Sequence, residues 1–277
     1  MLCAMILNFT KMHGLGNDFI VFEADDQHLL SADQLRILAD RRTGIGFDQA
    51  LVIQPPKRSG TDVYYRNFNA DGTEVEQCGN GARCLASLVA QQRGQATLHM
   101  DCLAGLIDAQ IRDDGQVSLD MGVPNFDPKS LPFVADGMSD YYTLDVNGQS
   151  VSIGAVSMGN PHAVLLVNDI ATAPVESLGT LIEVHPRFPN RVNVGFMHIS
   201  SRNEIHLRVF ERGVGETQAC GTGACAAVAI GRKRGTLEET VKVNLPGGQL
   251  SISWQGDGSK LWMTGPAVRV YTGQVEI

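Results

Sequence analysis

Hydrophobic and polar residues alternate in many short runs of this chain, a pattern typical of half-buried β-strands. Turn sequences such as Asp113-Asp-Gly and Gly256-Asp-Gly separate the runs. The alternation is clearest in segments 98–102, 106–111, 117–121, 205–210, 241–245, 250–254 and 261–264. The pattern therefore predicts a largely antiparallel sheet of short strands.

Two segments show the spacing of a helix instead. We expect one helix over residues 81–93, ended by Gly94, and a second over 223–234, ended by Gly235. Basic residues close both segments, which suits the negative end of a helix dipole. Residues 224–230 carry no polar side chain, so the second helix should be enclosed on every side.

Both expected helices belong to a duplicated plan, because each follows a Cys-Gly-polar-Gly-Ala sequence. Cys78 and Cys220 are 142 positions apart. Several other residues recur at an offset of 143: Gly16, Asn17, Gly105, Gly115 and Gly122 return as Gly159, Asn160, Gly248, Gly258 and Gly265. A nearly constant offset indicates two copies of one supersecondary unit. We therefore predict an α+β fold of two pseudo-symmetric halves, each a curved, mostly antiparallel sheet or barrel wrapped around a central helix.

The length of 277 residues is near the limit for one hydrophobic core, which favours two domains. We expect an N-terminal half over 1–122, joined by the C-terminal strand 266–277, and a C-terminal half over 123–265. Residues 1–7 are apolar without a basic leader, so we expect a first strand rather than a secretory signal.

A net charge of −8 leaves no basic surface for nucleic acid or anionic membrane. No apolar run is long enough to span a bilayer, and we expect a cytoplasmic protein. Six cysteines in a chain of this length without an export signal do not indicate a disulfide framework. Their spacing also lacks the CxxC pairs of structural zinc sites, so we expect no metal. Four should be buried small hydrophobes: Cys3, Cys84, Cys102 and Cys225.

The matched pair, Cys78 and Cys220, points to chemistry. A thiol at a helix start can become acidic enough to exchange protons near neutral pH. Two such thiols could remove a proton from one face of a carbon and deliver another to the opposite face. Backbone N–H groups of the first helical turns, at Gly79, Asn80, Gly221 and Thr222, could bind a carboxylate on that carbon. No lysine lies in a recognisable pyridoxal motif or beside either cysteine, so we expect a route without cofactor.

Five segments give the chain its resemblance to a known family: 11–19, 44–49, 156–162, 191–193 and 211–223. In these segments, and over nearly its whole length, the chain resembles the diaminopimelate epimerases, which are amino-acid racemases without cofactor. The resemblance implies two halves with one active site in the cleft between them. It implies epimerisation of LL-2,6-diaminopimelate to meso-diaminopimelate in lysine and peptidoglycan precursor biosynthesis. It also assigns Cys78 as proton donor and Cys220 as proton acceptor, and relatives include homodimers.

Substrate-binding residues follow from the same resemblance. They are Asn17, Gln49, Asn69, Asn160, Asn193, Glu211 and Arg212, beside the N–H donors of Gly79, Asn80, Gly221 and Thr222. Arg212 suits the distal carboxylate of the substrate and Glu211 its ammonium. The resemblance also implies that His162 and Glu211 adjust the acidity of the cysteines.

Three other functions stay open at this stage. A proline or hydroxyproline racemase would need a smaller, more apolar pocket than Arg212 and the asparagines suggest. A non-catalytic anion-binding or redox-sensing protein would not need both thiols. A thiol hydrolase would pair one cysteine with a histidine base. We also hypothesise that Cys78 and Cys220 form a disulfide on oxidation when no substrate is bound.

Overall fold

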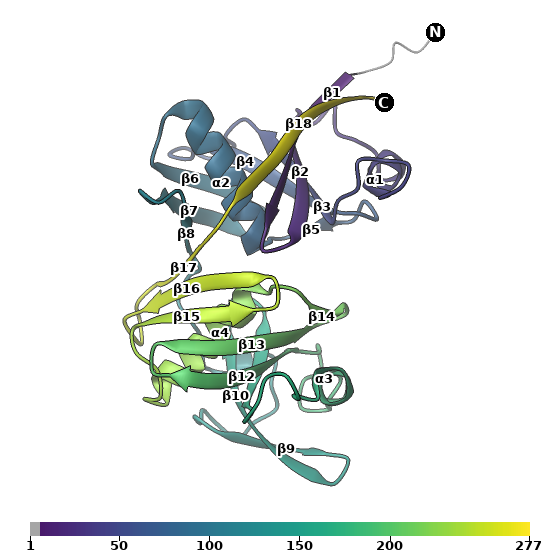
Figure 1. Cartoon of the computed structure of the whole chain (residues 1–277). Coiled ribbons are helices and arrows are strands. Elements are labelled where there is room, and N and C mark those ends of the chain that lie inside the picture. Colours follow the sequence, from purple (N-terminus) through teal and green to yellow (C-terminus); the bar gives the residue numbers. More distant parts are fainter. Residues whose placement is uncertain (1–5) are drawn as a thin grey trace. The chain divides into compact units, whose positions relative to one another are not determined.

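The computed structural model describes residues 6–277, which form two compact units (Figure 1). Unit 1 comprises the described residues up to Leu119 together with Gly265–Ile277, and unit 2 is Asp120–Thr264. The prediction for Cys3, and that for residues 1–5 of the first strand, lie outside the described residues. Ile6 and Leu7 begin strand β1.

Unit 1 contains two helices and the strands at both ends of the chain. Its helices are α1 (Ala32–Ala39) and α2 (Gly79–Arg93). Its strands are β1 (Ile6–Gly14), β2 (Asn17–Glu23), β3 (Gln49–Gln54), β4 (Val63–Asn69), β5 (Glu74–Val75), β6 (Thr97–Cys102), β7 (Gly105–Ile111), β8 (Val117–Asp120) and β18 (Val268–Glu276).

Unit 2 contains the same kinds of element in the same order. Its helices are α3 (Val175–Glu183) and α4 (Gly221–Lys233), with a short 3-10 helix, η1 (Pro128–Ser130). Its strands are β9 (Tyr142–Val146), β10 (Gln149–Ser157), β11 (Pro161–Leu166), β12 (Asn193–Ser201), β13 (Glu204–Glu211), β14 (Gly215–Thr217), β15 (Thr240–Leu245), β16 (Gly248–Trp254) and β17 (Leu261–Gly265).

Strand pairing in the two units repeats step by step. In unit 1, β1–β2, β3–β4, β4–β5, β6–β7 and β7–β8 are antiparallel, whereas β2–β3 and β4–β6 are parallel. In unit 2, β10–β11, β12–β13, β13–β14, β15–β16 and β16–β17 are antiparallel, whereas β11–β12 and β13–β15 are parallel. An outer strand completes each sheet, β18 against β1 and β9 against β10. The duplication read from the glycine and cysteine spacing is therefore a duplication of topology.

One helix lies within each sheet, as the sequence predicts. Helix α2 packs on β1, β2, β3, β6 and β7, and α4 packs on β10, β11, β12, β13 and β16. Residues 223–231 of α4 are all buried, which fits a helix without a polar face. The shorter helices cover separate apolar clusters, α1 through Leu35 and Leu38 and α3 through Val175 and Ile182.

The predicted fold class and elements are confirmed, with small shifts of boundary. Each central helix begins two residues earlier than predicted, at Gly79 and Gly221. Gly94 ends α2 in the left-handed conformation, at φ 67°. Cys84, Cys102 and Cys225 are buried as predicted. Helices α1 and α3 were not predicted, because each is a short segment joining two parallel strands.

Candidate functional site

Each of the paired cysteines is the N-cap residue of a central helix. Cys78 precedes α2 and Cys220 precedes α4, both with extended backbone. Their carbonyl oxygens accept the first helical bonds, from Ala82 N–H (2.8 Å) and Ala224 N–H (3.0 Å). The structure therefore puts both thiols where the N–H groups of a first helical turn lack partners within the helix.

The predicted residues of unit 1 come from neighbouring strand ends and the start of α2. The Cys78 thiol donates to Asn17 Oδ1 (3.4 Å), which also accepts from Asn80 Nδ2 (3.4 Å). Gln49 and Asn69 are opposite each other in the β3–β4 register, and Gln49 Nε2 donates to Asn69 Oδ1 (2.9 Å). Parallel pairing of β2 with β3 brings Asn17 and Gln49 to the same edge of the sheet. We call this set, with Gly79, half-site 1.

The corresponding set in unit 2, half-site 2, uses equivalent positions and keeps the cysteine and one asparagine while other side chains differ. Asn160 Nδ2 donates to Thr222 Oγ1 (3.4 Å), and Thr222 Oγ1 lies 3.7 Å from Cys220 Sγ. His162 Nε2 lies 2.9 Å from Asn160 Oδ1. Near the end of β13, Glu211 Oε1 accepts from Thr217 Oγ1 (2.5 Å), and the exposed Arg212 follows it in the chain. Asn193 and Gly221 complete the set.

The acidity expected of Cys220 is not what half-site 2 provides. Burial raises the pKa of the Cys220 thiol well above its usual value, and the Glu211 carboxylate raises it further. The Gly223 N–H and the Thr222 hydroxyl act in the opposite direction but do not offset burial. The prediction of an acidic thiol at this helix start is therefore wrong for Cys220. The thiol is protonated, with a carboxylate beside it that can accept its proton.

His162 is neutral at physiological pH. Complete burial lowers its pKa to about 3, and the positive charge of Arg212 contributes. Its Nδ1 atom is buried and has no hydrogen-bond partner among the described residues. The same is true of Gln49 Oε1 in half-site 1. Buried polar atoms without partners are unusual, and here they occur in both half-sites.

Asn193 uses its amide to hold the backbone of half-site 2. Its Nδ2 donates to Pro161 O (2.9 Å), and its Oδ1 accepts from Arg212 N–H (3.0 Å). Glu183 at the end of α3 accepts from Gly213 N–H (2.6 Å) in the same loop. Both side chains are buried. The structure therefore gives Asn193 a positioning role for Arg212.

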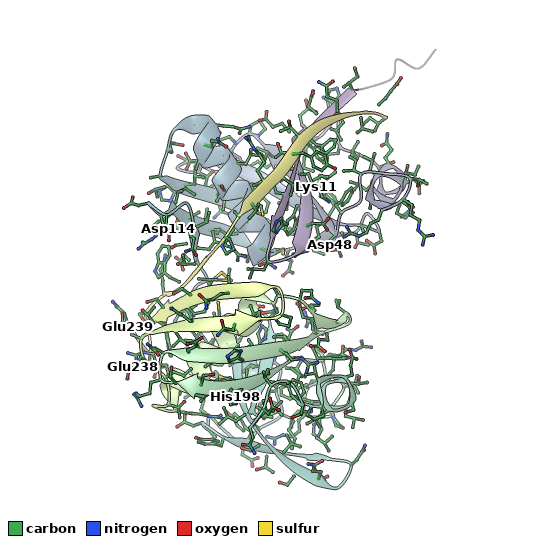
Figure 2. All side chains as sticks on the ribbon, viewed as in Figure 1. Lys11, Asp48, Asp114, His198, Glu238 and Glu239 are labelled. Carbon is green, nitrogen blue, oxygen red and sulfur yellow. The ribbon has the colours of Figure 1, made fainter. Side chains whose placement is uncertain are left out.

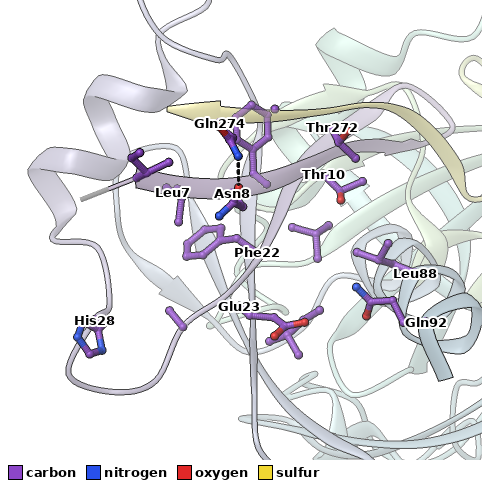
Figure 3. A pocket seen from close by; sticks show the side chains of 16 residues that line it. Leu7, Asn8, Thr10, Phe22, Glu23, His28, Leu88, Gln92, Thr272 and Gln274 are labelled. Atoms are coloured by element: carbon purple, nitrogen blue, oxygen red, sulfur yellow. Dashed lines mark hydrogen bonds between the residues drawn. The ribbon is translucent and has the colours of Figure 1, made fainter. Parts of the chain in front are cut away.

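A pocket of about 660 Å³ in unit 1 lies apart from half-site 1 (Figure 3). It is lined by residues of β1, β2, β18 and the later turns of α2, and Gln274 donates to Asn8, its partner in the β1–β18 register (2.8 Å). None of the predicted site residues lines it. Within residues 6–277, no group of three or more His, Cys, Asp or Glu side chains could hold a metal ion. No helix in that range is long and apolar enough to cross a membrane.

Comparison with known proteins agrees with the duplicated architecture. The family model for diaminopimelate epimerase matches residues 9–126 and 154–270. The chain belongs to the diaminopimelate epimerase family. Its relatives include the diaminopimelate epimerase of Pseudomonas syringae pv. syringae, 54% identical over 99% of this chain and 100% of the relative. Another from Thioalkalivibrio sulfidiphilus is 55% identical with the same coverage.

Solved structures extend the fold beyond the diaminopimelate epimerase family. A hydroxyproline epimerase from Agrobacterium vitis, with bound trans-4-OH-L-proline, superposes with a TM-score of 0.67 at 18% identity. That match covers 98% of this chain and 93% of the other. A probable proline racemase from Agrobacterium radiobacter superposes with a TM-score of 0.69 at 16% identity, over 97% of this chain and 92% of the other. At these identities the likeness shows the fold alone.

Three further polar residues of this diaminopimelate epimerase family member, Asp48, Arg83 and Thr217, contact the half-sites, and a fourth, Glu183, contacts Gly213 in the loop after Arg212. Sequence reasoning missed their contacts. Thr217 and Asp48 lie inside segments of the family resemblance, which was the one available signal. Arg83 and Glu183 gave none, because a charged residue on a helix is ordinarily solvent-exposed.

Proposed function

We propose that this protein catalyses the epimerisation of LL-2,6-diaminopimelate to meso-diaminopimelate, in lysine and peptidoglycan precursor biosynthesis. One observation carries the proposal. A cysteine begins the central helix of each repeated unit, in a chain more than half identical to diaminopimelate epimerases over nearly its full length. The proposed reaction uses the two thiols on opposite faces of one α-carbon.

Cys220 serves as the proton acceptor after losing its own proton to Glu211. The thiol is protonated in the free protein because burial and the Glu211 carboxylate raise its pKa. Glu211 contacts the thiol and is itself held by Thr217 Oγ1, so the carboxylate is positioned to take that proton. The thiolate so formed then removes the α-hydrogen as a proton.

Cys78 serves as the proton donor for the other face. Its S–H group donates to Asn17 Oδ1 in half-site 1, an arrangement that requires the protonated thiol. Once Cys78 has given its proton to the carbanion, the enzyme has a thiolate at 78 and a thiol at 220. In the reverse reaction the two cysteines exchange roles.

The carbanion needs stabilisation at the α-carboxylate, where negative charge accumulates. First-turn N–H groups of α2 and α4, at Gly79, Asn80, Gly221 and Thr222, are suited to that charge. Asn17, Gln49, Asn69 and Asn160 offer donors and acceptors to a zwitterion without imposing net charge. Arg212, exposed directly after β13, is proposed to pair with the distal carboxylate.

The test is exchange of the α-hydrogen of LL-diaminopimelate in heavy water. Cys78→Ala and Cys220→Ala should each abolish epimerisation while thermal unfolding stays that of a folded protein. Cys102→Ala is the matched control, because Cys102 lies at the end of β6 outside both half-sites. Full turnover by either single variant of the pair would defeat the two-base mechanism. Turnover of proline at a comparable rate would instead favour the racemase alternative.

We further propose a cytoplasmic homodimer that works without pyridoxal phosphate or metal. Val268, Val270 and Tyr271 on β18 are 41–55% exposed, an apolar surface suited to a second copy. Light scattering coupled to gel filtration would measure the assembly, and a monomer at working concentration would contradict it. Activity that fell with chelator or with a carbonyl reagent would contradict the cofactor-free route.

A further inference from the structure

In half-site 1, the side-chain amides of two asparagines form a hydrogen-bonded chain, and a charged side chain binds each end of that chain. Arg83 Nη2 donates to Asn80 Oδ1 (2.8 Å), and Asn80 Nδ2 donates to Asn17 Oδ1 (3.4 Å). Asn17 Nδ2 then donates to Asp48 Oδ2 (2.9 Å). Cys78 joins the hydrogen-bonded chain at Asn17 Oδ1 (3.4 Å). We call these four side chains, Arg83, Asn80, Asn17 and Asp48, the amide relay.

The charged ends give the relay one direction. An arginine can only donate and a carboxylate can only accept, so Arg83 selects the oxygen of Asn80 and Asp48 selects the nitrogen of Asn17. The NH₂ group of Asn80 and the oxygen of Asn17 are then left to face each other as donor and acceptor. The consequence is that Asn17 turns its acceptor oxygen, not its NH₂ group, toward the Cys78 thiol.

Both end residues are themselves held in place. Arg83 is fully buried and also donates to Pro266 O (3.2 Å). Asp48, labelled in Figure 2, accepts from Asp18 N–H (3.1 Å) and from Arg41 Nη2 (2.7 Å). Arg41 in turn binds both carboxylate oxygens of Asp18. The orientation of the Asn17 amide is therefore set by a network larger than the relay.

Unit 2 has neither charged end. Gln49 pairs with Phe19 in the β2–β3 register, and Asn193 pairs with His162 in the equivalent β11–β12 register. Phe19 therefore corresponds to His162, and Asp48, which precedes Gln49, corresponds to Val192. The offset of 142 that relates Cys78 to Cys220 relates Arg83 to Cys225. With His162 holding its oxygen, Asn160 turns its NH₂ group toward Thr222. The equivalent asparagines thus present opposite groups at the two helix starts.

We propose that Asp48 and Arg83 are positioning residues that fix the Asn17 amide with its oxygen toward Cys78, and so favour the protonated Cys78 thiol in the free protein. The inference rests on the proposed function for its meaning. The arrangement itself is tested by a measurement that needs no substrate. The asymmetry between halves then distinguishes the donor cysteine from the acceptor cysteine in an otherwise duplicated enzyme.

Alkylation of Cys78 by iodoacetamide at neutral pH is the readout, in a Cys220→Ala background. Asp48→Asn removes one of the two charged ends that orient the Asn17 amide, so its NH₂ group can reach the sulfur in part of the molecules, which favours the reactive thiolate. We expect alkylation to become about tenfold faster, since a hydrogen bond to a charged group is worth at least a factor of ten. Asp26→Asn is the matched control, because Asp26 also accepts from a side-chain amide, that of Gln54 (2.9 Å), outside half-site 1. It should leave the rate unchanged.

A second background separates orientation from charge. With Asn17→Ala present, Asp48→Asn should no longer change the rate, because the amide that it releases is gone. An equal acceleration in that background would assign the effect to the lost negative charge and overturn the proposal. Buried Cys84 on the same helix reports general loosening, and its alkylation should not rise. No acceleration by Asp48→Asn alone would also overturn the proposal.

Neutron diffraction on the deuterated, unmodified protein keeps the question answerable if Asp48→Asn does not fold. Deuterons on the Asn17 side-chain nitrogen should point to Asp48, and their pointing to Cys78 Sγ would refute the assignment. Epimerase assays on the same variants are a separate arm. If Cys78→Ala retains turnover, the proposed function fails while the alkylation and neutron results still decide the relay.

Discussion

Asn193 and Gln49 occupy equivalent positions at the starts of β12 and β3. Replacement by alanine should nevertheless mainly reduce stability at Asn193 and mainly reduce activity at Gln49. Asn193→Ala removes a buried hydrogen bond to Pro161 O and a part-buried one from Arg212 N–H. Each buried backbone group left without a partner costs about 1–3 kcal/mol. We therefore expect a loss of about 3 kcal/mol in the free energy of unfolding, a large share of a typical total of about 5–15 kcal/mol.

Gln49→Ala should have the smaller effect on stability and a direct effect on substrate. It removes one hydrogen bond, to the half-buried Asn69, together with an Oε1 atom that has no partner among the described residues. The expected loss of stability is about 1 kcal/mol or less. If Gln49 Oε1 binds the substrate, kcat/KM should fall about tenfold or more, which corresponds to one lost hydrogen bond.

Urea unfolding and steady-state epimerase kinetics on both variants decide between the two roles. At about 2–4 °C per kcal/mol, Asn193→Ala should also lower Tm by about 6–12 °C. Unfolding of Asn193→Ala within about 0.5 kcal/mol of the parent protein would show that its amide does not support the Arg212 loop. The original assignment of Asn193 as a substrate ligand would then be favoured.

Three further predictions concern unit 2. Glu211→Gln removes a charge that raises the pKa of Cys220, so alkylation of that thiol should occur at lower pH. At the same time kcat should fall about a hundredfold, because the group that accepts the Cys220 proton is lost. Unchanged turnover would exclude Glu211 as that acceptor. The pKa of His162 is lowered to about 3 from 6.5, so the unfolded chain binds a proton that the folded protein does not, and stability falls as pH drops below 6.5. His162→Phe should therefore reduce the loss of stability between pH 7 and pH 5 by about 2 kcal/mol in urea unfolding. An unchanged loss would show that folding does not lower the pKa of His162. Gly179→Ala places a Cβ 2.7 Å from Phe210 Cγ and should destabilise the protein by about 1–3 kcal/mol. The control Gly137→Ala, whose added Cβ would have no atom within 4 Å, should leave stability nearly unchanged. Equal urea unfolding midpoints for the two variants would contradict the close packing of α3 on β13.

Periodicity and repetition predicted the features that depend on local sequence. The two central helices, some of the strands around them and the duplication were readable, because small residues after Cys-Gly and alternating strands have strong local signals, whereas strands such as β2, β3, β11 and β12 were not predicted. Helices α1 and α3 were missed because each is short. The division into domains at 122/123 and 265/266, the assigned roles of the site residues and the disulfide between Cys78 and Cys220 stay predictions.

Features that depend on long-range contacts were not readable. Arg83 meets Pro266 across 183 positions of sequence, and Asn193 meets Arg212 across 19. The thiol of Cys220 shows the same limit. Its place at a helix start suggested acidity, but burial and Glu211 outweigh the favourable N–H groups. The sequence shows that a thiol lies at the N-terminus of a helix, but it does not show how deeply the thiol is buried.

Pairing of β18 with β1 has a consequence for synthesis on the ribosome. Unit 2 is one continuous stretch of chain, whereas unit 1 receives its outer strand, β18, from residues that are translated after the whole of unit 2. Until those residues emerge, one edge of β1 keeps unpaired N–H and C=O groups, the kind of edge that recruits foreign strands. The unit that is translated first is therefore completed after unit 2, and a nascent or truncated chain ending before Val268 carries an open sheet edge that is prone to aggregation.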